Sequence, residues 1–344
     1  MTIPTSPLSI NKEKNHTVQF PNHPIPRAIF LDSGGVINCN DTRGPQWIQY
    51  LTEYMPTTVL QGPGLLWGRA NKKMSHDLFV DKGFDRLMAQ AKDHEELDRL
   101  YRLHWIQRSV DLVNQYIEEA EEKANEHAKE GQDATSGVTP VHKKIVLPES
   151  EEEQIAIAKA AHDHCVGRVR ADYPGAVEAI LALKQKLHFE LFTCSGESST
   201  DLKLTFRTLG IRAISDLTLE AEEEEDLHPI FTKLYGPDLI NCHKASTRFY
   251  ELIFEDCGVP AHEALVVDDK ESILAWAKVL GAITVQISTK DRTGNELMVD
   301  QVQYIQNDKT GALEKKTVQV PAVDYQLGSL AELPALVAQW KNRR

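Results

Sequence analysis

The chain has 344 residues, with 51 acidic and 38 basic side chains and a formal net charge of −13 at pH 7. This length allows two domains of roughly 100 to 200 residues each. The negative balance argues against a nucleic-acid or anionic-membrane binder, because the long-range field repels phosphates. We expect a small-molecule substrate, and a phosphorylated one would need cations placed beside it.

Cysteine usage and hydropathy indicate the compartment. The five cysteines are scattered and include no CxxC pair, which favours reduced thiols over a disulfide or zinc framework. There is no run of 18 apolar residues, and the N-terminus lacks the apolar core of a signal peptide. We therefore expect a cytoplasmic protein.

The first predicted element after a polar, proline-rich arm at residues 1–25 is a short strand that ends at a carboxylate. Residues 28–31 are apolar and too few for a helix, as in a buried parallel strand, and Asp32, Gly34 and Gly35 follow. Ligands bind at the carboxyl ends of strands in open α/β sheets, so Asp32 is a catalytic candidate. An aspartate that caps a turn would give the same local pattern.

The next 131 residues, 41–171, are predicted to form an all-helical insert. Apolar residues recur every three or four positions from 46 to about 129, and no convincing strand interrupts them. Residues 131–153 are typical of a loop or partly disordered segment, and a further helix is expected at 154–168.

From Tyr173 onward, helices and strands alternate in the manner of a parallel sheet with right-handed crossovers. Strands are expected at 189–192, 264–267 and 284–287. Helices are expected at 200–209, 249–257, 273–280 and 330–340. The acidic run at 222–226 is interpreted as an exposed loop, and the segment 290–323 contains two candidate strands that could form a hairpin.

Four polar positions follow the predicted strands or precede the predicted helices, namely Asp32, Thr193, Lys244 and the pair Asp268 and Asp269. Taken singly, each has a structural explanation as a cap or a surface charge. Their order resembles the four motifs of the haloacid dehalogenase superfamily, which are an aspartate nucleophile, a threonine or serine, a lysine and an acidic pair. The match covers about residues 27–38 and 172–288.

The resemblance implies an α/β fold in two parts. A Rossmann-like parallel sheet core would comprise residues 26–40 and 172–344, and residues 41–171 would form the inserted helical cap of the first type.

The resemblance also implies roles for individual residues. Asp32 would attack phosphorus and form an aspartyl-phosphate, with Lys244 holding it and the Thr193 hydroxyl contacting the phosphoryl oxygens. Mg²⁺ would be the cofactor, because it prefers hard oxygen ligands. Its expected ligands are Asp32, the backbone carbonyl of Gly34, Asp268 and Asp269. The expected substrate-binding residues are Gly35, Arg43, Ser195 and Gly196.

One position departs from the family pattern. Phosphatases of this superfamily carry a second aspartate two residues after the nucleophile as the general acid, and this chain has Gly34 there. Such an acid is typically worth about 10²- to 10⁴-fold in rate. The leaving group could need no proton, or the cap could supply the acid, for example from Asp41 or His104.

The missing acid leaves three functions open. Mg²⁺-dependent phosphoryl transfer on a small phosphorylated metabolite ranks first, because the acidic pair is retained. A haloacid dehalogenase or phosphonate-type C–X hydrolase ranks second, because the aromatic residue of the DxY form is absent. A catalytically degenerate phosphate-binding protein ranks third.

Substrate choice is expected to reside in the first half of the cap, which concentrates cations and aromatic side chains. Arg43 is the preferred candidate, because a guanidinium can form paired hydrogen bonds to a carboxylate or phosphate and the residue lies in the polar hinge. Trp47 and Trp67 stand at helical spacing, which favours core positions for both.

Overall fold

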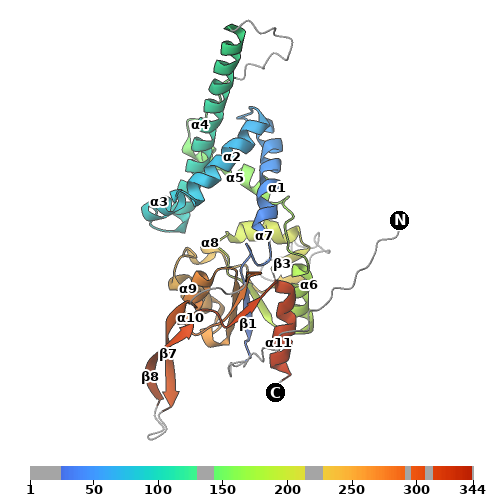
Figure 1. Ribbon diagram of the computed structural model, residues 1–344, viewed down its shortest axis with the longest axis vertical. Coiled ribbons are helices and arrows are strands. Elements are labelled where there is room, and N and C mark those ends of the chain that lie inside the picture. Colours follow the sequence, from blue (N-terminus) through green and yellow to red (C-terminus); the bar gives the residue numbers. More distant parts are fainter. Residues whose placement is uncertain (1–24, 130–142, 214–227, 291–295, 307–312, 343–344) are drawn as a thin grey trace, which may run out of the picture.

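The computed structural model describes residues 25–129, 143–213, 228–290, 296–306 and 313–342. It has two parts, a sheet-based core at the bottom of Figure 1 and a helical cap above it. The predicted arm at residues 1–25 falls almost entirely outside the described residues, as does the acidic run 222–226.

Five parallel strands form the core sheet in the order β2-β1-β5-β6-β9. Their bounds are Ala28–Leu31 for β1, Glu190–Thr193 for β2, Ala264–Asp268 for β5, Ile283–Ile287 for β6 and Tyr325–Leu327 for β9. Because β1 lies between β2 and β5, the residues that follow these three strands meet at one edge of the sheet.

Helices cover both faces of this sheet, as side-chain alternation along the strands requires. Ile29 and Leu31 pack in one core cluster with α6 (Ala176–Leu181), α7 (Ser199–Arg207) and α11 (Leu333–Lys341). Ala28 and Phe30 pack in the other with α9 (Thr247–Cys257) and α10 (Glu271–Val279). This confirms the predicted Rossmann-like α/β fold.

The cap has its own hydrophobic core, which includes Trp67, Met74 and Val113. Its helices are α1 (Asn40–Tyr54), α2 (Gly64–Phe79), α3 (Gly83–Gln90), α4 (His94–Lys129) and α5 (Glu151–Val166). The C-terminal half of α4 extends away from the core (Figure 1). None of the described helices is both long enough and apolar enough to cross a membrane.

Two linkers run side by side between cap and core. The N–H of Cys39 donates to the carbonyl oxygen of Ala171 at 2.7 Å, and the N–H of Tyr173 donates to that of Ile37 at 2.8 Å. The helical insert thus leaves and rejoins the core directly beyond Asp32, which brings the first turn of α1 near the end of β1.

The remaining elements are short, except for one hairpin. The predicted strands of segment 290–323 form an antiparallel pair, β7 (Met298–Gln306) and β8 (Leu313–Pro321), as a separate two-stranded sheet. A second small sheet pairs β3 (Ile211–Ala213) with β4 (His228–Phe231). The short helix α8 is Pro237–Ile240, and single turns cover Met55–Thr57, Ala182–Lys186, Ala261–Glu263 and Leu330–Glu332.

Candidate active site

Asp32 stands directly after β1, where its N–H continues the strand ladder by donating to the carbonyl oxygen of Val267 at 3.0 Å. The loop after it closes on itself, since the N–H groups of Ile37 and Asn38 both donate to the carbonyl oxygen of Ser33, at 2.9 and 2.8 Å. The side-chain amide of Asn38 also donates to Ser33 Oγ at 3.1 Å. The loop is therefore a compact, hydrogen-bonded turn.

Glycine is required at position 35 of this turn. Gly35 has a φ of +81°, a region that side chains with a Cβ disfavour. A Cβ there would lie 2.5 Å from both Cγ and Oδ2 of Asp269. The glycine thus lets the backbone of the loop after Asp32 approach the carboxylate of Asp269, which follows β5.

The ammonium of Lys244 joins two carboxylates. Lys244 lies in the segment that precedes α9, and its Nζ is 3.1 Å from Asp32 Oδ1 and 2.6 Å from Asp268 Oδ2. Its side chain is only 5% exposed. Burial acts to lower the pKa of Lys244, but Asp32 and Asp268 outweigh it and hold that pKa well above its usual range. Lys244 therefore stays charged.

Three carboxylates converge beside this lysine. Oxygen atoms of Asp32, Asp268 and Asp269 lie within 4.8 Å of one another. Burial raises the pKa of Asp32 to about 6, with Lys244 opposing and Asp268 adding to the increase. Burial and the charge of Asp268 likewise raise the pKa of Asp269. The cluster is costly to ionise without further positive charge, and its hard oxygens match the ligand preference of Mg²⁺.

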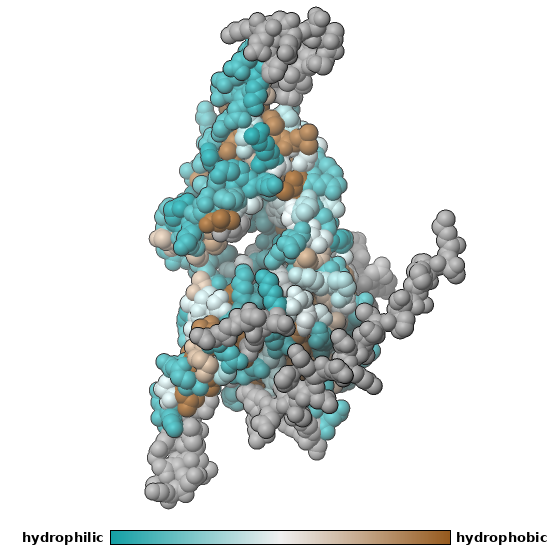
Figure 2. All heavy atoms as spheres, in the orientation of Figure 1, coloured by the Kyte–Doolittle hydropathy of each residue, from teal (hydrophilic) through white to brown (hydrophobic). Residues whose placement is uncertain are grey.

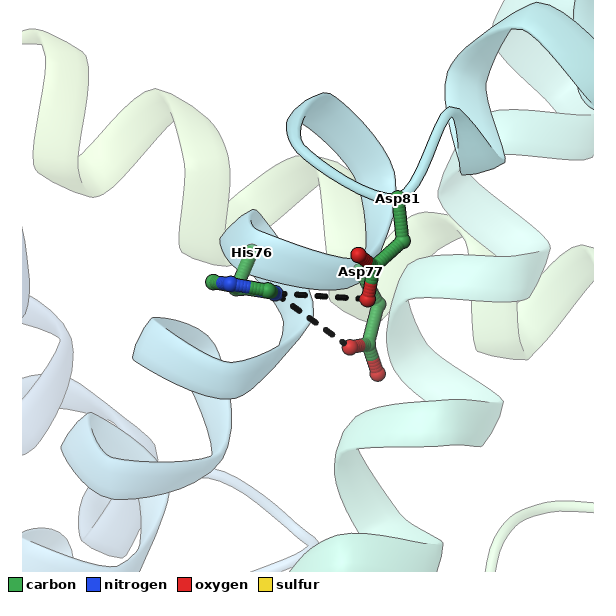
Figure 3. A group of neighbouring side chains, drawn as sticks. All are labelled: His76, Asp77 and Asp81. Carbon is green, nitrogen blue, oxygen red and sulfur yellow. Dashed lines mark ion pairs between the residues drawn. The ribbon is translucent and has the colours of Figure 1, made fainter.

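A second group of possible ligands lies on the cap, at the C-terminal end of α2 (Figure 3). Nδ1 of His76 is 3.3 Å from Asp81 Oδ2 and 4.0 Å from Asp77 Oδ1. Lys73 already pairs with Asp77, while His76 and Asp81 are exposed. A solvated charge cluster accounts for this arrangement, so we assign no metal site there.

The end of β2 differs from expectation. Thr193 lies opposite Leu31, is fully buried, and its hydroxyl donates to the carbonyl oxygen of Tyr235 at 3.0 Å. That hydroxyl is therefore not presented to a ligand, contrary to the predicted phosphoryl contact.

Cys194 takes the place beside Asp32, since its N–H donates to the carbonyl oxygen of Leu31 at 3.0 Å. Burial raises the pKa of its thiol, against the opposing effect of Lys244. Sequence reasoning missed this residue. The strand register reveals it, because Phe30 and Phe192 form a pair two residues before Asp32 and Cys194, and side chains alternate along a strand.

The predicted substrate-binding residues lie around the same loops. Ser195 is buried and its Oγ accepts from the N–H of Glu197 at 3.2 Å, whereas Gly196 is exposed. Arg43 of α1 pairs with the carboxylate of Glu197. Burial lowers the pKa of Arg43, while Asp201 and Asp32 act in the opposite direction. Arg43 therefore connects the cap with the core and lies within electrostatic reach of Asp32.

The cap contains a cavity of about 710 Å³, and Asn40 and Arg43 are among the residues that line it. Figure 2 shows the surface hollowed where cap and core meet. Trp67 is fully buried in the cap core as expected, and Trp47 is partly buried against that core while also lining the cavity. The two suggested cap acids fit poorly. Asp41 and His104 are both exposed, and neither lines this cavity.

The residues at the ends of β1, β2 and β5, the lysine before α9 and the helical insert after β1 together form the site of a capped, Rossmann-like α/β protein. The chain belongs to the haloacid dehalogenase-like hydrolase family, whose sequence model matches residues 26–281. This confirms the predicted family and the assignment as a hydrolase. No curated protein matches the chain.

Solved structures of similar architecture share little sequence with the chain. One is a defluorinating L-2-haloacid dehalogenase, at 16% identity, with a TM-score of 0.47 over 91% of this chain and 95% of that one. Another is an L-2-haloacid dehalogenase from Xanthobacter autotrophicus with chloropropionic acid covalently bound, at 13% identity, with a TM-score of 0.44 over 91% and 98%. A third is CbbY from Rhodobacter sphaeroides in complex with phosphate, at 16% identity, with a TM-score of 0.41 over 90% and 96%.

Proposed function

We propose that this hydrolase is a Mg²⁺-dependent phosphatase that forms an aspartyl-phosphate on Asp32. The observation that carries the proposal is the charge of the site. Three carboxylates and one ammonium carry a net charge of −2 when all are ionised. An anionic substrate is repelled by such a site unless a cation is added, so the cluster is better suited to a dication than to a bare anion.

The residues present fit a magnesium ion. The carboxylates of Asp32, Asp268 and Asp269 offer hard oxygens on one side, and the missing Cβ of Gly35 leaves room for Asp269 against the loop. The backbone carbonyl of Gly34 remains a proposed further ligand. When bound, Mg²⁺ supplies positive charge that stabilises the developing charge on the phosphoryl oxygens.

The remaining chemistry belongs to side chains of this chain. The Asp32 carboxylate attacks phosphorus, and the phosphorus–oxygen bond of the leaving group breaks with its electron pair on that oxygen. Water then attacks phosphorus in the aspartyl-phosphate, which releases inorganic phosphate and regenerates Asp32. Lys244 holds the nucleophile in place through its 3.1 Å contact.

A dehalogenase is the second candidate, and Gly34 favours it. A halide leaves without a proton, so displacement of halide by Asp32 needs no general acid at that position. The charge of −2 weighs against this candidate, as does Arg43. This cap cation near Asp32 is already paired with Glu197 rather than free for a substrate carboxylate.

One assay panel separates the candidates. Release of phosphate from phosphate monoesters and of halide from 2-haloacids is measured with Mg²⁺ and with a chelator. We expect Mg²⁺-dependent phosphate release that is lost in Asp32→Asn. Metal-independent halide release would instead support the dehalogenase. Phosphate binding without turnover would support a degenerate phosphate-binding protein.

The metal site is tested separately by calorimetric titration with Mg²⁺. Asp269→Asn is expected to weaken binding at least tenfold, while Asp111→Asn, which changes an exposed carboxylate on α4, serves as the matched control. Equal affinity in both variants would remove Asp269 from the ligand set.

A further inference from the structure

Asn40 stands where the missing general acid would act. A Cβ added to Gly34 would lie 3.3 Å from Asn40 Oδ1 and 3.6 Å from its Nδ2. The side-chain amide of Asn40, at the start of α1, therefore borders the space that an acidic side chain at position 34 would enter. An amide can donate a hydrogen bond but has no proton to transfer at neutral pH.

An amide in place of an acid restricts the reaction to leaving groups that depart without a proton. An alkoxide resembles hydroxide, whose conjugate acid, water, has a pKa of about 15.7, so its departure depends strongly on protonation. A phenolate is far less basic, since a phenol such as the tyrosine side chain has a pKa of about 10. A hydrogen bond from the Asn40 amide, without proton transfer, is therefore sufficient for the departure of a phenolate.

The cavity beside Asn40 has the size and lining for a ring. Its volume of about 710 Å³ exceeds the needs of a phosphate and lies in the range of sites for small organic molecules. Three aromatic side chains line it, namely Trp47, Tyr101 and Trp105. Flat apolar surfaces of this kind favour stacking with an aromatic ligand.

One polar group on the wall is held in place. Trp105 Nε1 donates to Asn71 Oδ1 at 3.2 Å, and Asn71 is 6% exposed. This contact orients the amide and leaves its nitrogen as a donor at the cavity wall. The cavity thus combines aromatic surface with a fixed hydrogen-bond donor, the usual composition of a small-molecule site.

We propose that the substrates are aryl phosphates, with the aromatic ring bound in the cap cavity and the ester oxygen beside Asn40. This inference rests on the proposed phosphatase function. The bond between phosphorus and the aryl oxygen breaks as Asp32 forms its bond to phosphorus. The phenolate leaves with the electron pair and takes a proton from water.

Three substrates test separately the preference for a phenolate leaving group and the binding of a ring in the cap cavity. Phosphate release is measured for 2-naphthyl phosphate, for 2-(2-naphthyl)ethyl phosphate, and for acetyl phosphate. The second keeps the ring but has an alkoxide leaving group, and the third has a good leaving group without a ring. We expect kcat to be about 10²- to 10⁴-fold higher for the aryl ester than for the naphthylethyl ester, the range that an acid normally supplies. Acetyl phosphate should be hydrolysed with a higher KM than the aryl ester.

Substitutions in and beside the cavity provide the controls. Gly44 lines the cavity, and a Cβ there meets nothing within 4 Å, so Gly44→Phe should fill the cavity without strain. It should raise KM for 2-naphthyl phosphate at least tenfold, and by a larger factor than KM for acetyl phosphate. Leu65→Phe, at an exposed position on α2, is the matched control. Gly34→Asp should increase turnover of the naphthylethyl ester more than that of the aryl ester.

His162 could act as a cap acid, because it also lines the cavity. Its Nε2 lies 3.0 Å from Asp201 Oδ1, so this nitrogen is directed to a carboxylate of the core. We expect His162→Gln to leave the ratio of the two naphthyl substrates unchanged. Rapid hydrolysis of the alkyl ester that is lost in His162→Gln would overturn the inference.

Failure of the inference and failure of the proposed function give different results. Asp32-dependent hydrolysis of acetyl phosphate, with no preference for the aryl ester, would overturn the aryl assignment and retain the phosphatase. Absence of phosphate release from all three substrates would overturn both, even if 2-naphthol bound to the protein in a calorimetric titration.

Discussion

Replacing Gly35 by alanine tests how the loop after Asp32 and the carboxylate of Asp269 depend on each other. The added Cβ would lie 2.5 Å from Cγ of Asp269, so either the loop or that carboxylate must move. The left-handed backbone, with a φ of +81°, adds a conformational cost of roughly 1–2 kcal/mol. Gly258→Ala is the matched control, because Gly258 has a φ of +66° and its Cβ would meet nothing within 4 Å.

The two alanine variants should therefore differ in function more than in stability. Chemical denaturation should show a loss of about 1–2 kcal/mol for Gly258→Ala and a larger loss for Gly35→Ala. Calorimetry should show Mg²⁺ affinity reduced at least tenfold in Gly35→Ala alone. The argument would be refuted if Gly35→Ala bound Mg²⁺ like the unmodified protein and lost no more stability than Gly258→Ala.

Three further predictions concern buried charges. Lys278 Nζ is 2.7 Å from both carboxylate oxygens of Asp324. Chemical denaturation at pH 7.5 should therefore show that Lys278→Met lowers the free energy of unfolding by about 3–5 kcal/mol. The exposed Lys159→Met should lower it by only about 0–1 kcal/mol. Lys244→Met should destabilise the metal-free protein more at pH 7.5 than at pH 5, where protonation relieves the unpaired carboxylates; an equal loss at both values would contradict this. The pKa of Asp32 is raised to about 6, so the native state binds more protons than the unfolded state between about pH 4 and 6. The metal-free protein therefore loses stability as the pH rises through that range of about pH 4 to 6. The increase in melting temperature caused by Mg²⁺ should therefore be small at pH 5 and full above pH 7, whereas a pH-independent increase would count against these ligands.

The central strands could be predicted because they are buried on both faces and leave continuous apolar runs. The apolar residues of β1 are all fully buried, and the first four of β5 are too. The missed strand β9 has only three residues and pairs only with β6 at the sheet edge. Its apolar signal is correspondingly weak. Strand β4 includes Pro229, which also weakens a strand pattern.

The charged part of the site could also be predicted, because the carboxyl ends of adjacent parallel strands lie close together regardless of the conformation of the connecting loops. Asp32 follows β1, Asp268 and Asp269 lie at the end of the adjacent strand β5, and Lys244 contacts Asp32 and Asp268 from the segment before α9. The choice between Thr193 and Cys194 could not be predicted from the apolar run alone. It depends on the register that places Thr193 opposite Leu31, and a shift of one residue reverses the two faces.

The contacts between cap and core arise from residues far apart in the sequence. Arg43 pairs with Glu197, and His162 Nε2 lies 3.0 Å from Asp201 Oδ1. Glu197 lies in the loop that carries Ser195 and Gly196, and Asp201 lies in the first turn of α7, so the segment after β2 contacts the cap twice. Arg43 lines the cap cavity, and the charge of Asp32 acts to raise the pKa of this guanidinium. Under the proposed function, selection of a substrate by the cap and its reaction in the core would therefore both involve Arg43.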